Sequence, residues 1–335
     1  MPGGKAAGNK VKIWIVSAFP MAVFVCTLLV IRPSMEGSPG GIYPDEVFCV
    51  VSVNGGGYTK QNRVFIKQGD DISVLPVFII NGGFYSEVGH FVIDNKMITA
   101  KRLPGTEFFW YQINPEYREG GYDNFALAPK KQFNTYLEPI SYSYLQIGES
   151  GELRLADIVC DGYGAYYIQA MPKNSIPDDF ESSGAIYIES GVTQIVYRSG
   201  DSYLGYLSEH MRSPFIMYPK NTMPGHQTDL IIGSDCAEFA IYGFRRLGYD
   251  IPYCGPQNIH KYLTPLTEDE FIMPGDILHF GVQVAVYFES RAIPGKIDDK
   301  DILLQSYGVK PHFTTVGENV GLFGAYSVYR HTDLR

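Results

Sequence analysis

The sequence predicts an apolar N-terminal segment followed by two domains, the first all-β and the second α+β. Three observations lead to this fold class: a continuous apolar run at 13–31, many short strand-like segments between 42 and 206, and one well-capped helix near 236 with strands after it. The chain has 335 residues, which is enough for two domains and a tail. Its 25 Tyr, 20 Phe and frequent Gly and Pro favour β structure.

The first 41 residues indicate a membrane anchor. Residues 1–12 carry three lysines and are expected to form a cytoplasmic tail. The apolar run 13–31 would be about 28 Å long as a helix, close to the hydrocarbon thickness of a bilayer. It predicts an uncleaved transmembrane helix, with a cleaved signal peptide as the alternative. Residues 32–41 read as a linker, and the bulk of the chain is expected outside the cytoplasm, in the periplasm or at the cell surface.

Charge and cysteine content exclude several classes of partner. The net charge of −9 and the lack of a Lys/Arg cluster argue against nucleic acid. No C-x-x-C motif or zinc-like Cys/His spacing occurs, so neither a metal nor another cofactor is expected. A bridge between Cys49 and Cys160 is possible if the body is exported. Cys26 lies inside the apolar run and is expected to be a small apolar residue of that helix.

Residues 42–206 predict an antiparallel β-sandwich of seven or eight strands. The apolar stretches are short, rich in β-branched and aromatic residues, and separated by turn residues. The string DGYGAYYIQA (161–170) resembles the tyrosine corner of immunoglobulin-like domains, with Tyr166 or Tyr167 as the corner residue. Trp110 and its aromatic neighbours are either core or a ligand platform, and the core reading is favoured.

Residues 207–335 contain the candidate chemistry. Asp235 is a good N-cap and Glu238 follows three residues later, so a helix of about three turns is expected to begin at Cys236 and to stop at Gly248. A thiol at a helix N-terminus meets free N–H groups and the positive end of the helix dipole, which favour the thiolate. Cys236 is therefore a candidate nucleophile, and the alternative is a small buried residue. Cys254 is expected to be a loop cysteine.

Two further segments follow this helix. The string PGDILHFGVQVAVYFE (274–289) predicts a tight hairpin with Gly281 first in the turn. In a plain two-residue hairpin His279 pairs with Val284, which puts His279 and Gln283 on opposite faces. The string DILLQSYG (301–308) predicts another strand, which ends in the polar residue Gln305.

The order of these segments resembles the NlpC-type family of papain-like cell-wall cysteine peptidases. The resemblance covers 233–308 and implies a papain-like α+β domain with Cys236 as nucleophile. In that family the second hairpin strand opens with the catalytic histidine, but this chain has Gln283 there. The third polar residue of the family, which orients the histidine, matches Gln305.

Two functions follow from the resemblance. In the first, the Cys236 thiolate cleaves peptide or amide bonds of peptidoglycan, His279 carries the proton, Gln305 orients it and Gln283 donates to the oxyanion. His226 is a second candidate for the base, and acyl transfer by the same thiol is a weaker option. In the other function, the site is inactive and the protein is an envelope binding or scaffolding module, because glutamine is no base. The remaining histidines are expected to be surface or structural: His90, His210, His260, His312 and His331.

Overall fold

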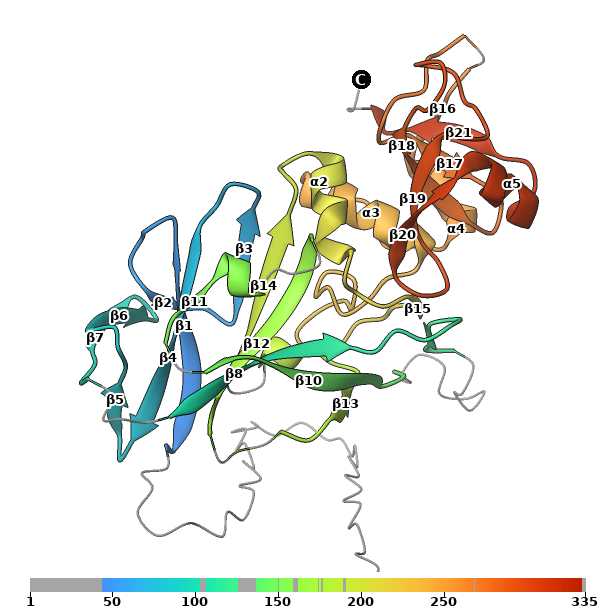
Figure 1. The fold of residues 1–335 in the computed structure, drawn as a ribbon. Helices are drawn as coiled ribbons and strands as arrows, with labels where there is room; N and C mark the ends of the chain where they lie inside the picture. Colours follow the sequence, from blue (N-terminus) through green and yellow to red (C-terminus); the bar gives the residue numbers. More distant parts are fainter. Residues whose placement is uncertain are drawn as a thin grey trace, which may run out of the picture. The chain divides into compact units, whose positions relative to one another are not determined.

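The fold is mostly β. The computed structural model describes residues 44–102, 107–125, 137–149, 151–158, 162–173, 175, 177–188, 191–267 and 269–332. Strands take 41% and helices 16% of the described residues. These residues belong to one compact unit that runs from Ile42 to Arg335, and its three large sheets can be followed in Figure 1.

Two sheets form the N-terminal part of this unit, and their short β-branched and aromatic segments favour strands. The first sheet has the order β11-β4-β1-β2-β6-β7 with β5 on β4. Its strands are β1 (Glu46–Val53), β2 (Thr59–Lys60), β4 (Ile72–Ile80), β5 (Gly83–Tyr85), β6 (His90–Ile93), β7 (Lys96–Thr99) and β11 (Leu153–Arg154).

The second sheet has the order β13-β10-β8-β12-β14-β3. Its strands are β3 (Arg63–Lys67), β8 (Phe108–Pro115), β10 (Ile140–Glu149), β12 (Gly164–Pro172), β13 (Phe180–Ser182) and β14 (Val192–Arg198). The pairing of β14 with β3 is parallel, whereas the sequence predicted antiparallel strands throughout. The pairing of β2 with β6 is parallel as well.

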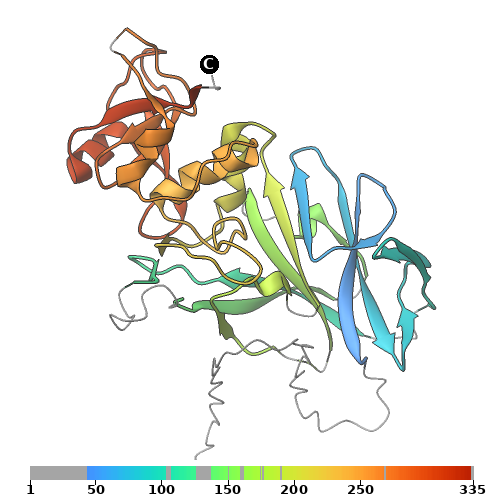
Figure 2. The ribbon, with the colours of Figure 1, turned by 180° about the vertical axis from the view of Figure 1, so that it is seen from behind.

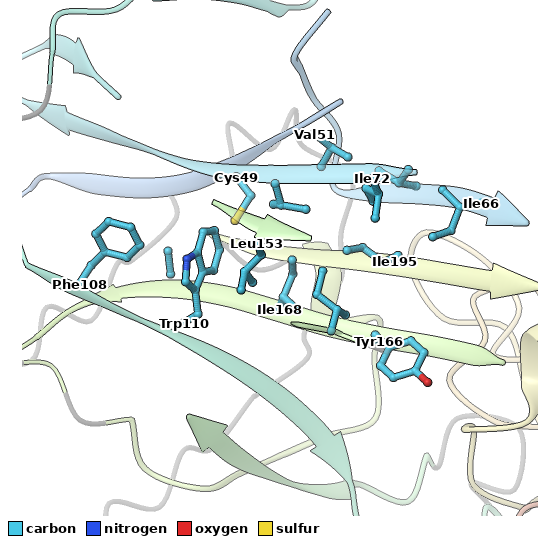
Figure 3. Close-up of a cluster of buried hydrophobic side chains, with 14 of the residues drawn as sticks. Cys49, Val51, Ile66, Ile72, Phe108, Trp110, Leu153, Tyr166, Ile168 and Ile195 are labelled. Atoms are coloured by element: carbon cyan, nitrogen blue, oxygen red, sulfur yellow. The ribbon is translucent and has the colours of Figure 1, made fainter. Parts of the chain in front are cut away.

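The two sheets pack face to face around one apolar core. Figure 3 shows Cys49 and Val51 from β1 facing Trp110, Ile168 and Ile195 from the second sheet. Trp110 has no exposed surface, which confirms the core reading of this residue. Burial of such aromatic and aliphatic side chains is the main force that holds the sheets together.

Two details of this core concern residues named from the sequence. Cys49 is a free buried thiol, and Cys160, with which a bridge was considered possible, lies outside the described residues. The Tyr166 hydroxyl donates to the carbonyl of Gly162. A tyrosine bonded to backbone a few residues upstream is the geometry of a tyrosine corner, so Tyr166 rather than Tyr167 has that role.

Several short elements connect the strands of these sheets along the chain or lead to the C-terminal region. They are β9 (Tyr122–Asp123), α1 (Leu155–Ile158), η1 (Ile186–Ile188), α2 (Tyr203–Leu207), η2 (Ser208–His210) and β15 (Ile216–Met217). Strand β15 pairs in parallel with β9, so the two regions are joined by backbone hydrogen bonds. Arg212 strengthens this joint, because its side chain donates to Asn114 of β8 at 3.0 Å.

The C-terminal region is one antiparallel sheet with a helix against it. The sheet has the order β16-β21-β17-β18-β19-β20. Its strands are β16 (Thr264–Pro265), β17 (Ile277–His279), β18 (Val284–Glu289), β19 (Ile302–Ser306), β20 (Pro311–Thr315) and β21 (Ser327–Arg330), and its helices are α3 (Cys236–Arg246), α4 (Pro256–Ile259), η3 (His260–Tyr262) and α5 (Val316–Phe323).

Helix α3 is the central element of this region. One of its faces shares a buried core with the side chains of Ile277, Val284, Val286 and Leu304. Helix α2 also lies beside it, as both views show (Figure 1, Figure 2). The ring of Tyr203 in α2 stacks on Phe244 of α3 with centroids 4.3 Å apart.

The predicted fold class is wrong in its C-terminal part. Among the described residues, α3 is the only helix in this region longer than eight residues, and the rest is an antiparallel sheet with short helices. This is not a papain-like α+β domain. The prediction failed because one capped helix and one hairpin were extended to a whole family fold, although they cover under a third of the chain.

The predicted membrane anchor has no support either. The segment 13–31 lies outside the described residues, and none of the helices within them is long and apolar enough to cross a bilayer. The prediction that the chain is membrane-anchored rested on that apolar segment, and it is wrong for the part of the chain that the structure describes.

Candidate functional site

Helix α3 begins as the sequence predicted, and this positions Cys236. The Asp235 carboxylate accepts the backbone N–H of Glu238 at 2.9 Å, which satisfies one of the free donors of the first turn. Helix α3 starts at Cys236, and Gly248 has a left-handed φ of 97° just past its end. In a full capping box the Glu238 carboxylate would also accept the backbone N–H of Asp235. Here that carboxylate accepts from the Thr228 hydroxyl at 2.7 Å instead.

The Cys236 thiol lies between the helix start and the sheet. The backbone N–H groups of Cys236, Ala237 and Val284 are within hydrogen-bonding reach of its sulfur. A hydrogen bond joins the end of β19 to the residues before α3: the Ser306 hydroxyl donates to the Ser234 carbonyl at 3.0 Å.

These donors do not make Cys236 a thiolate. Burial raises its pKa well above that of an ordinary thiol, and the neighbouring Asp235 carboxylate raises the pKa further, against the lowering by the three N–H groups. The side chain is only 7% exposed. A buried, protonated thiol is a poor nucleophile, so the expectation that the helix N-terminus activates Cys236 does not hold for this geometry.

Two glutamines occupy the positions that the resemblance assigns to a catalytic histidine and its orienting residue. Gln283 precedes β18 and Gln305 lies in β19, and both are almost fully buried. The Gln283 Nε2 group donates to Gln305 Oε1 at 3.0 Å. An amide neither accepts nor releases a proton near neutral pH, so this pair supplies no general base.

His279 does not take over the role of the missing base. The hairpin register pairs it with Val284, as predicted, which sets His279 and Gln283 on opposite faces of the sheet. Its Nε2 group bonds to the carbonyl of Pro256 at 2.9 Å, and its ring packs near His260 and Tyr329. Within the described residues, no hydrogen bond joins Cys236 to a histidine.

His226, the second candidate, is held as a neutral structural ring. Its Nδ1 accepts the backbone N–H of Thr228 at 3.3 Å, and its ring stacks on Tyr253 with centroids 4.4 Å apart. Burial lowers its pKa to about 4. The Glu238 carboxylate lies 3.6 Å from Nδ1, and burial raises the pKa of that carboxyl, so an ion pair is not favoured at neutral pH.

His312 lies beside Gln305, whereas it was expected to be a surface or structural histidine. Strand β20 pairs with β19 so that His312 lies opposite Gln305, and Gln305 Nε2 is 3.4 Å from His312 Nε2. A signal was present in the string SYGVKPH: a short turn after Gln305 returns the chain with a polar residue opposite it. Without knowledge of the pairing, that residue read as a surface histidine.

The chemistry available here is hydrogen bonding. The site combines a protonated thiol and a pair of amides, and among the described residues no hydrogen bond links Cys236 to a group that could remove its proton. Among the described residues, no cluster of three or more His, Cys, Asp or Glu side chains could hold a metal ion. Such a set of donors and acceptors suits recognition of an amide or peptide better than its cleavage.

Comparisons with models of protein families, with curated proteins and with solved structures found no match to this chain.

Proposed function

We propose that this protein binds a peptide or amide ligand of bacterial cell-wall peptidoglycan without cleaving it. The resemblance around Cys236 supports a peptidoglycan ligand, and the geometry of the site supports binding without cleavage.

The observation that carries the proposal is the hydrogen bond between Gln283 and Gln305. A catalytic cysteine needs a base within hydrogen-bond reach, and the position for that base holds an amide already engaged with its neighbour. The raised pKa of Cys236 supports the same conclusion, because burial keeps the thiol protonated. Peptidoglycan hydrolysis through Cys236 with His279 as base is the less favoured function, since His279 bonds to Pro256.

The test uses the full chain with purified peptidoglycan and with soluble peptide fragments prepared from it. We expect wild type to co-sediment with peptidoglycan and to release no more fragments, by mass spectrometry, than Cys236→Ala. Gln283→Ala should weaken binding of the soluble fragments about tenfold, the effect of losing one hydrogen bond of about 1.4 kcal/mol. The matched control is Gln146→Ala, which removes an exposed glutamine of β10 and should bind like wild type.

Two outcomes would contradict the proposal. Fragment release by wild type that Cys236→Ala abolishes would establish a hydrolase. Failure of wild type to bind peptidoglycan or its fragments, with the protein folded, would remove the proposed ligand.

A further inference from the structure

A cavity lies at the C-terminal end of α3, the opposite end of that helix from Cys236. Its volume is about 320 Å³, at the small end of the range for ligand pockets. Cys236 and Arg246 are the first and last residues of α3, so a rise of about 1.5 Å per residue separates them by about 15 Å. The cavity is therefore distinct from the site around Cys236. Its lining is Asp229, Arg245, Arg246, Gly248, Tyr249 and Asp250.

Arg246 presents a fixed guanidinium group to this cavity. Its Nε and Nη2 groups donate to the two carboxylate oxygens of Glu209, each at 3.0 Å, and Glu209 is fully buried. The guanidinium lies over the ring of Phe65 at 4.4 Å and over the ring of Tyr206 at 5.0 Å. Its Nη1 group has no hydrogen-bond partner among the described residues. A planar guanidinium held in this way suits a carboxylate at its free N–H groups.

Asp250 supplies the opposite charge on the same lining. It is exposed and lies two residues after Gly248, which has a left-handed φ of 97°. Within the part of the chain that the structure describes, its carboxylate has no hydrogen bond and no ion pair. The other acid, Asp229, is engaged: it accepts from Arg245 Nη2 at 3.3 Å and from the Tyr253 hydroxyl at 2.6 Å. The lining thus holds a free guanidinium edge and a free carboxylate that do not pair with each other.

The charges of the lining decide which class of ligand fits. Two arginines and two aspartates sum to zero. An anion on Arg246 would lie near the Asp250 carboxylate and near the negative end of the α3 dipole. A cation on Asp250 would lie near two guanidinium groups. A ligand that carries both charges avoids each of these repulsions.

We propose that this cavity binds a zwitterionic α-amino acid. Its carboxylate would accept from Arg246 Nη1, and its ammonium would donate to the Asp250 carboxylate. Both charges of such a ligand sit on one carbon, which suits a cavity of this size. A peptide bond at either group removes one charge, so a residue inside a peptide should not bind here. This second site goes beyond the proposed function and does not rest on it.

The experiment is a ¹H–¹⁵N NMR titration of the labelled full chain at pH 7. The probes are glycine and both enantiomers of alanine, leucine and tyrosine. We expect at least one of these amino acids to shift the backbone amide signals of Gly248 and Asp250 and the Nε signal of Arg246. Its N-acetyl and carboxamide derivatives, which each lack one charge, should bind at least tenfold more weakly.

Two variants test the residues that hold the ligand. Asp250→Asn keeps the size of an exposed side chain and should weaken binding about tenfold. Arg246→Lys keeps a positive charge beside Glu209 but loses the planar fork, and it should weaken binding to a similar extent. Thermal unfolding shows whether Arg246→Lys is folded, and Asp250→Asn remains decisive if it is not. Asp269→Asn, at an exposed aspartate of another loop, is the matched control and should bind like wild type.

Four results would overturn the proposal. They are no binding of any probe by the folded protein, equal binding of the N-acetyl or carboxamide derivative, wild-type affinity in Asp250→Asn, and shifts confined to residues away from the cavity. Inorganic phosphate that shifts the same signals while no amino acid does would replace the zwitterion site by an anion site. Binding of peptidoglycan fragments at Gln283 is measured separately, so either proposal can fail while the other stands.

Discussion

Asp235 combines helix capping with burial of a carboxyl group, and these two demands oppose each other at neutral pH. Its carboxylate caps α3 by accepting the N–H of Glu238. Burial nevertheless raises its pKa from 3.8 to about 6, against the lowering by backbone N–H groups. The folded state therefore holds a proton between these values that the unfolded state releases, so the stability contributed by this group falls as the pH rises from about 4 to 6.

Asp235→Asn tests this assignment at the residue itself. Asparagine caps as well as aspartate but carries no charge. We expect the variant to match wild type near pH 4 and to exceed its free energy of unfolding by roughly 1–3 kcal/mol at pH 7. Denaturant unfolding at both pH values measures this. Asp235→Ala is the control for the cap and should lose about 1 kcal/mol at pH 4. An Asn variant with an equal offset at both pH values would disprove the raised pKa.

At the scale of elements, the contact between α2 and α3 depends on a glycine inside a helix. A Cβ added at Gly243 of α3 would meet the Tyr203 ring at 2.6 Å and Leu207 at 2.8 Å, both on α2. The two helices approach closely only because that side chain is absent. Alanine has the higher helix propensity, but the clash must push the helices apart or move a buried ring.

We therefore expect Gly243→Ala to destabilise the protein by about 1–3 kcal/mol. Gly321 of α5 is the matched control, since nothing lies within 4 Å of a Cβ added there. Gly321→Ala should stabilise by up to about 1 kcal/mol through helix propensity alone. Thermal unfolding of both variants checks the pair. Stabilisation by both substitutions would refute close packing of α2 on α3.

The elements around the site were predictable where the signal is local. The N-cap at Asp235, the helix start at Cys236 and the turn at Gly281 each follow from residue types within a few positions, and the structure confirms all three. Such signals depend on backbone geometry that the chain determines over one or two turns. They predict where each element begins and ends, but not which other elements it packs against.

Contacts that depend on the pairing of distant strands could not be predicted from the sequence. The hydrogen bond between Gln283 and Gln305 joins β18 to β19, and His312 enters through the register of β20. Loop lengths and apolar pattern allow several strand orders, and the parallel pairing of β14 with β3 was not anticipated. The resemblance to a peptidase implied a papain-like fold that the structure does not have.

At the scale of the whole molecule, the sandwich and the C-terminal region share a closely packed joint. Gly121 has a left-handed φ of 69° and lies so near Phe215 that an added Cβ would be 2.4 Å from its ring. The Tyr117 hydroxyl donates to the Arg212 carbonyl at 2.7 Å across the same joint. Contacts of this density couple the stability of the two regions, so neither is expected to unfold alone.

Two buried free thiols report on the two regions separately, which makes this coupling measurable. Cys49 lies in the sandwich core and Cys236 at the start of α3, and each is protected only while its region is folded. In urea, pulsed thiol labelling of the full chain read by peptide mass spectrometry should give one common midpoint for both. Gly121→Ala should lower both midpoints together by more than Gly120→Ala, which has a similar φ of 80° but an empty space for the Cβ. Labelling of Cys236 at a urea concentration that leaves Cys49 protected would show that the regions unfold independently. Both alanine variants carry a similar strain from a positive φ, and only Gly121→Ala also clashes with Phe215. A larger drop of both midpoints in Gly121→Ala therefore assigns the coupling of the two regions to the joint at Gly121.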